Sequence, residues 1–245
     1  MKDRKDKKEK RIHFVFDKKT KNVLSLVCNA LFVILAVYCF IIIIVKGGQG
    51  NMEVEGKEGL RYFTIESNLL CALSCLIVLI YNIRGIGIPK WALKLKYVGC
   101  VSVGVTMVVA LAFLGPMVGF DQILGGINLF LHLIMPLLAI FSFILFEGEI
   151  QYKNRFGERS KNRPISLKES LLGIIPTLIY GLLYYYLVLI AGKWEDFYSF
   201  NSGMLEGKWY LVYIAIVLLA LLLGVIIRGF HILCNKEYKI RGYTL

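Results

Sequence analysis

The chain has 245 residues, of which 57% are hydrophobic, and its mean hydropathy is +0.65. A soluble domain carries closer to half apolar residues, so this composition excludes an ordinary water-soluble globular protein. The formal net charge of +12 would indicate nucleic acid in a soluble protein, but the placement of the basic residues explains it by membrane topology, and we expect no nucleic-acid partner.

The apolar residues fall in long unbroken blocks. A helical span needs about 20 apolar residues to cross a hydrocarbon core of about 30 Å. Only helices and closed barrels satisfy all backbone hydrogen bonds in lipid, and the blocks lack the alternation of barrel strands, so they are predicted to be helices. We predict an all-α polytopic membrane bundle of six transmembrane helices, with spans at 23–45, 62–83, 96–115, 127–146, 170–191 and 209–231.

Six glycine and proline residues interrupt the region of the third and fourth predicted spans, so its helix boundaries are expected to shift by several residues. These residues are Gly104, Gly115, Pro116, Gly119, Gly125 and Gly126. The membrane domain covers 23–231, between a basic tail at 1–22 and a C-terminal tail at 232–245.

Lysine and arginine residues are distributed unevenly between the two sides of this arrangement. The segments 1–22, 84–96, 147–169 and 228–245 hold 10, 4, 6 and 4 of them, whereas the three opposite loops hold 3, 0 and 2. Cytoplasmic loops carry the excess of positive charge, so this pattern predicts that both termini are cytoplasmic. Membrane lipids are the expected partners, because basic residues close to the surface attract anionic headgroups.

The six cysteines lie in spans or at their ends, and none has the spacing of a metal site. A packing role is favoured over a redox or metal role. The sequence lacks a Walker glycine loop, an H-E-x-x-H helix and a G-x-S-x-G elbow, and we expect no cofactor and no metal.

Aromatic residues crowd the third outer loop, GKWEDFYSFNSGMLEGKW. Such rings are suited to the headgroup level of the bilayer, where they would form an interfacial belt. The alternative is a lid over a lipid-accessible cavity. The residues concerned are Trp194, Phe197, Tyr198, Phe200 and Trp209.

Few polar residues lie inside the predicted spans, and they gather toward the outer side. The second span contains Thr64, Glu66, Ser67 and Asn68 in FTIESNLL, and the fourth contains Asn128 and His132 in NLFLHLIMP. Helix geometry puts the hydroxyl and amide residues of the second span on one face, with the glutamate turned about 200° away from the threonine.

Thr64 lies about one turn, and His132 about one and a half turns, inside the outer boundary at about 1.5 Å per residue, so the two side chains can meet. A hydroxyl beside a neutral imidazole is the minimal pair for a nucleophile activated by a general base. The same pair would also serve as a simple hydrogen bond between two membrane helices.

This pair resembles the androgen-induced hydrolase family, multi-span enzymes that use a threonine and a histidine to cleave fatty acid esters of hydroxy fatty acids. The match is Thr64 within YFTIESNLL and His132 within NLFLHLIMP. The whole chain is more similar to uncharacterised bacterial six-span relatives of that family, through FTIESN, the His-x-x-x-Pro of the fourth span and GKWEDFYSFNSG.

The resemblance implies a lipid-ester hydrolase of a bacterial plasma membrane, with Thr64 as nucleophile and His132 as base. Asn68 or Asn128 could stabilise the oxyanion through a side-chain amide. Glu66 would bind a cation or proton, or simply be solvated. Two other functions stay open: a transporter or channel that uses Glu66, Asn68, Asn128 and His132 as a polar pathway, and a noncatalytic scaffold.

Overall fold

The computed structural model describes residues 18–46, 56–147, 152–153, 159–160, 164–200 and 207–235. Most of the two predicted tails, 1–22 and 232–245, therefore lies outside the described residues. The regular helices are α1 (Lys18–Lys46), α2 (Phe63–Arg84), α3 (Lys90–Val109), α4 (Gly115–Val118), α5 (Phe120–Ile123), α6 (Met135–Phe146), α7 (Leu167–Ser170), α8 (Ile175–Tyr185) and α9 (Trp209–Cys234).

Shorter irregular elements connect or extend these helices. Three π-helical segments are continuous with them, namely Ala110–Leu114, Phe130–Ile134 and Tyr186–Ile190. Two 3-10 segments cover Gly56–Arg61 and Leu171–Ile174. The strands β1 (Tyr152–Lys153) and β2 (Arg159–Ser160) form one antiparallel pair, with Tyr152 opposite Ser160.

Within the described residues, five helices are long and apolar enough to cross a membrane. They are Lys19–Val45, Phe63–Arg84, Lys90–Val118, Leu167–Ile190 and Trp209–Cys234. The remaining predicted span corresponds to a shorter apolar helix, Phe130–Phe146. The helical prediction is thus confirmed, whereas the count of six spans and the orientation of the termini stay predictions.

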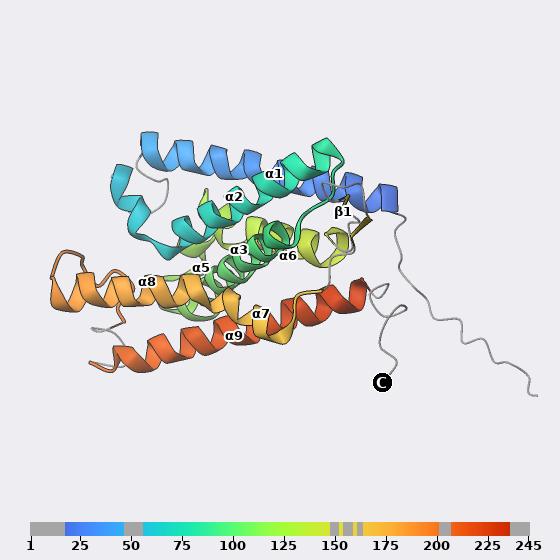
Figure 1. The fold of residues 1–245 in the computed structure, drawn as a ribbon. Coiled ribbons are helices and arrows are strands. Elements are labelled where there is room, and N and C mark those ends of the chain that lie inside the picture. Colours follow the sequence, from blue (N-terminus) through green and yellow to red (C-terminus); the bar gives the residue numbers. More distant parts are fainter. Residues whose placement is uncertain are drawn as a thin grey trace, which may run out of the picture.

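The helices lie side by side, with α3 at the centre of the bundle (Figure 1). Helix α3 packs against α2, α6 and α9, while α1 packs against α2 and α6. In the most apolar 18-residue stretch of Lys90–Val118, 56% of the residues are buried. In the corresponding stretch of Trp209–Cys234, 17% are buried. The core therefore surrounds α3, and the outer helices keep much of their apolar surface exposed.

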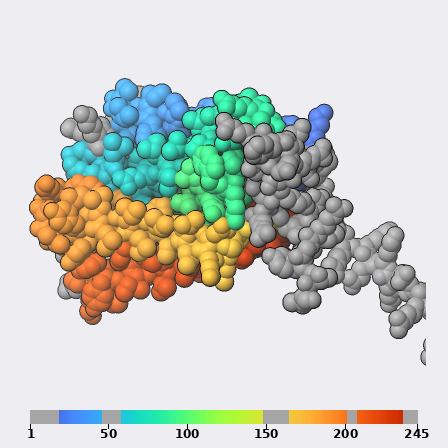
Figure 2. Space-filling model, viewed as in Figure 1, coloured from blue at the N-terminus to red at the C-terminus, as the bar shows by residue number. Residues whose placement is uncertain are grey.

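Large apolar side chains are exposed along the outer helices, which form the surface seen in Figure 2. Ile34 on α1, Ile179 on α8 and Leu218 on α9 are 64%, 62% and 59% exposed. Soluble monomers rarely show apolar surface on this scale, whereas lipid solvates it well. The exposed surface is consistent with a multi-pass membrane protein.

The bundle has two ends with different polar groups. The start of α2 lies at the left in Figure 1, and we call this the Thr64 end. The start of α1 and the end of α9 both lie at the opposite end, which we call the Lys96 end.

Two of the π-helical segments have a local cause in proline. Pro116 and Pro136 each follow such a segment by two residues. A proline inside a helix cannot donate to the carbonyl four residues earlier, and its ring collides with that carbonyl. An extra residue in the preceding turn relieves the collision. For Pro136 the affected carbonyl belongs to His132, so the proline shapes the turn that carries this histidine.

Candidate functional site at the Thr64 end

The first turn of α2 and the π-helical turn before α6 bring Thr64 and His132 together. The Oγ1 atom of Thr64 lies 3.3 Å from Nε2 of His132. The histidine is only 5% exposed, while Thr64 is half-buried. The contact expected from the sequence is therefore present, at a distance somewhat longer than an optimal hydrogen bond.

The other ring nitrogen of His132 fixes its tautomer. Nδ1 lies 2.7 Å from the backbone carbonyl oxygen of Ile123, at the end of α5. A carbonyl oxygen only accepts, so Nδ1 carries the proton and a neutral ring leaves a lone pair on Nε2. The hydroxyl of Thr64 then donates to Nε2, which is the polarity that a general base requires.

Asn68 lies one turn after Thr64 and joins the two helices beside the pair. Its Nδ2 group donates to the carbonyl oxygens of Thr64, at 2.7 Å, and of Leu131, at 3.2 Å. Both amide hydrogens are thereby used on backbone acceptors. Asn68 holds the turn that carries His132 against α2, and it keeps no donor for a ligand.

A cavity of about 80 Å³ opens beside Thr64, which is enough for several water molecules or part of an alkyl chain. Its walls are predominantly apolar and aromatic and come from α2, α3, α8, α9 and the connection between α8 and α9. Its polar lining residues include Thr64, Thr106, Thr177 and Asp196. An apolar cavity with a few convergent polar groups is the usual form of a small-molecule site.

Thr177 of α8 also lines this cavity. Its Oγ1 atom is buried and has no hydrogen-bond partner among the described residues. The Thr106 hydroxyl, by contrast, is already bonded to Ser67 at 2.8 Å. A buried hydroxyl is rarely left unpaired, which makes Thr177 a candidate donor to a ligand in the cavity.

The aromatic residues expected at the membrane interface contribute instead to the cavity wall. Tyr198, Phe200 and Trp209 line it directly. The Oη atom of Tyr198 accepts from the backbone N–H of Phe63, at 2.9 Å, and so satisfies the first free amide of α2. Burial raises the pKa of the Tyr198 phenol, which therefore stays neutral. Three of the five aromatic residues thus line the cavity, as the alternative of a lid requires, while an interfacial belt at the headgroup level stays a prediction.

Glu66 and Asn128 lie away from the pair. Glu66 faces a separate open groove of about 620 Å³ between α2, α3 and α8, together with Trp91 and Lys94. Asn128 donates from Nδ2 to the carbonyl oxygen of Gln122 in α5, at 3.0 Å, across the short turn between them. The structure thus brings Thr64, Asn68 and His132 together but not the other two predicted site residues.

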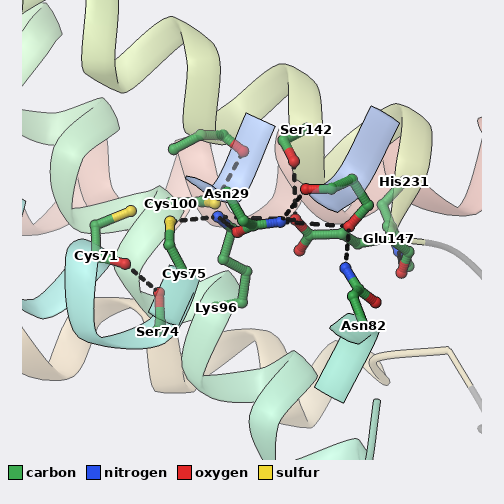
Figure 3. Close-up of polar contacts among 12 residues, drawn as sticks. Asn29, Cys71, Ser74, Cys75, Asn82, Lys96, Cys100, Ser142, Glu147 and His231 are labelled. Atoms are coloured by element: carbon green, nitrogen blue, oxygen red, sulfur yellow. Dashed lines mark hydrogen bonds and ion pairs between the residues drawn. The ribbon is translucent and has the colours of Figure 1, made fainter. Parts of the chain in front are cut away.

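A second group of buried polar residues lies toward the Lys96 end. Lys96 of α3 and Glu147 after α6 are both fully buried, with Nζ 3.7 Å from Oε1. Asn29 of α1 links them, since its Oδ1 accepts from Lys96 and its Nδ2 donates to Glu147, both at 2.8 Å. Figure 3 shows these side chains pointing toward one another, with Ser142 and Cys75 beside them.

This second cluster was missed because both charges lie at the boundaries of predicted spans, where a charged side chain is expected to reach water. Lys96 is the first residue of the predicted third span, and Glu147 follows the last residue of the fourth. In the structure α3 begins six residues earlier, at Lys90, so Lys96 lies inside the helix. Asn29, in the middle of the first predicted span, was the available signal for a buried polar partner.

A scan against family models and searches of curated proteins and of solved structures gave no match to this chain. The chemistry of the two clusters has to be argued from their own geometry.

Proposed function

We propose that the chain is a six-span membrane hydrolase that cleaves lipid esters, with Thr64 as nucleophile and His132 as general base. The observation that carries this proposal is the orientation of His132, whose Nδ1 is held on the Ile123 carbonyl while Nε2 accepts from Thr64. A hydrogen bond that only joined two helices would not need an adjoining cavity. Here Thr64 lines one.

In the proposed reaction, the Thr64 oxygen attacks the ester carbonyl while its proton moves to Nε2 of His132. The tetrahedral intermediate collapses, and the alcohol leaves with that proton. Water then attacks the acyl-threonine, His132 takes one water proton, and the carboxylic acid is released as Thr64 recovers its proton. Thr177 lines the same cavity and has an unpaired hydroxyl, so we assign this hydroxyl as the donor to the carbonyl oxygen, in place of the Asn68 and Asn128 amides.

A lipid ester is the substrate class that suits these walls. The cavity is lined mostly by aromatic and aliphatic side chains, which favour an acyl chain over a polar solute. The resemblance to the androgen-induced hydrolase family supports the same class. The positive-inside pattern would put the Thr64 end at the outer face of a bacterial plasma membrane, so that substrate enters from the outer leaflet.

The test is covalent labelling of the purified, folded protein by a lipid-like fluorophosphonate, with the labelled residue identified by mass spectrometry. We expect the label on Thr64, and we expect Thr64→Val and His132→Ala to abolish it. Thr106→Val is the matched control, because Thr106 lines the same cavity but does not contact His132 in any described hydrogen bond. An unlabelled wild type, or a label that persists in Thr64→Val, would refute the proposal.

The polar-pathway alternative receives less support from the geometry. Asn68 and His132 are bonded to backbone carbonyls, and Glu66 and Asn128 face other surfaces. Proton-coupled flux in proteoliposomes that is lost in Glu66→Gln and retained in Thr64→Val would nevertheless favour transport over hydrolysis.

A further inference from the structure

The side chains of Cys75 and Lys96 meet in an unusually close contact between α2 and α3. The Nζ atom of Lys96 lies 2.7 Å from the Sγ atom of Cys75. Both side chains are fully buried. The absence of a side chain at Gly99 of α3 lets the two backbones approach closely here. A Cβ atom added to Gly99 would lie 2.9 Å from the Cα atom of Cys71 on α2.

This distance is too short for an ordinary hydrogen bond between an amine and a sulfur atom. Charge-assisted N–H···O bonds reach about 2.7 to 2.9 Å, and sulfur is a larger atom than oxygen, so its hydrogen bonds are longer. A separation of 2.7 Å instead fits a nitrogen and a sulfur atom that are both bonded to one small atom between them. Oxygen is the atom that cysteine oxidation supplies.

We propose that Cys75 and Lys96 form a reversible covalent crosslink in which one oxygen atom bridges Sγ and Nζ. Molecular oxygen is the oxidant. The thiol and the neutral amine each lose one hydrogen, S–O and N–O bonds form, and the second oxygen atom leaves with both hydrogens as water. Sulfur and nitrogen each lose two electrons, and the four electrons reduce one O₂ molecule.

The neighbouring groups supply what this reaction needs. The lysine must be a neutral amine, and the Glu147 carboxylate, 3.7 Å from Nζ, can take its extra proton. The second oxygen of that carboxylate, Oε2, is buried and has no partner among the described residues. The Asn29 Oδ1 atom holds Nζ in place at 2.8 Å. Oxygen is small and apolar, so it reaches a site inside a lipid-facing bundle that a charged oxidant does not reach.

The product also removes a buried charge pair. Transfer of the lysine proton to Glu147 and formation of the bridge leave both partners neutral, and so remove the desolvation penalty that a buried ion pair carries. The crosslink joins α2 to α3 and does not depend on the hydrolase proposal, because neither Thr64 nor His132 takes part.

The test is the intact mass of wild-type protein purified in detergent under air, compared with protein kept anaerobic with dithiothreitol. We expect the air-exposed protein to be heavier by about 14 Da, one oxygen atom gained and two hydrogen atoms lost, and digestion to yield a peptide pair joined through Cys75 and Lys96. Two molecules of dithiothreitol return four electrons and four hydrogens, which restores the thiol and the amine and releases water.

Variants and the reversal by thiol separate this bridge from other products. Cys75→Ser should abolish the added mass, whereas Cys39→Ser, another fully buried cysteine on α1, should retain it. A folded, air-exposed wild type of unmodified mass would overturn the proposal. So would a loss of about 2 Da from a disulfide, or an added 14 Da that dithiothreitol does not remove, as expected for a methyl group. The peptide map of the wild type decides the matter even if Cys75→Ser does not fold.

Discussion

Removing one member of the buried Lys96–Glu147 pair should destabilise the protein much more than removing the second member afterwards. Both side chains are 0% exposed, so Lys96→Met leaves the Glu147 carboxylate without a counter-charge, and Glu147→Leu leaves the ammonium in the same state. Each single substitution should cost about 3 to 5 kcal/mol. The double variant loses the bonds to Asn29 and Ser142 but no longer buries an unpaired charge.

We therefore expect a coupling energy of about 2 kcal/mol or more from the double-mutant cycle. The measurement is unfolding by dodecyl sulfate in mixed micelles, followed by circular dichroism, with dithiothreitol present to keep Cys75 reduced. Lys90 and Glu169 provide the matched control, because their atoms are closer, at 2.8 Å, but 35% and 21% exposed. Their coupling should stay below about 1 kcal/mol. Coupling that is larger for the exposed pair, or absent for the buried one, would refute the reasoning.

Three further substitutions test other contacts. Gly99→Ala should cost about 1 to 3 kcal/mol of unfolding free energy, because the new methyl group meets the α2 backbone, while Gly229→Ala, which meets nothing within 4 Å, should not destabilise in the same unfolding assay. Tyr198→Phe leaves the Phe63 amide unpaired at the start of α2 and should cost about 1 to 3 kcal/mol, with faster hydrogen exchange at that amide as the direct measurement. Thr177→Val should lower the rate of ester hydrolysis by about 10²-fold without reducing the unfolding free energy, and unchanged kinetics would remove this residue from the site.

The helical fold and the Thr64–His132 contact could be predicted because each depends on strong, local signals. Apolar blocks of span length determine helices in lipid whatever their neighbours are. The two polar residues lie at similar depths in separate helices, so a contact required only that the helices be adjacent. Asn128 shows the limit of this kind of prediction. It has a similar depth, but it donates to the carbonyl oxygen of Gln122 in α5 and not to a neighbouring span.

The π-helical turns and the Lys96–Glu147 pair could not be predicted in the same way. A hydropathy window ends a span where charge begins, so it places both residues of the pair at a membrane boundary, where water can solvate them. Whether a charge at a span boundary is buried depends on which helix packs against it, and that information lies in Asn29 and Cys75 on other helices. Pro136 predicts from proline geometry alone that the turn carrying His132 is distorted, but not that the distortion takes the form of a π-helix.

The two proposed sites can be tested independently because α2 separates them. Thr64 and Cys75 lie eleven residues apart on one continuous helix, which corresponds to about 16 Å along its axis. A rigid helix still transmits a small shift, and Cys75 contacts α3 while α3 contributes Thr106 to the cavity wall. If the crosslink changed the packing of α2 on α3, fluorophosphonate labelling would differ between oxidised and reduced wild type. Equal labelling rates in the two forms would establish that the Lys96 end and the Thr64 end act separately.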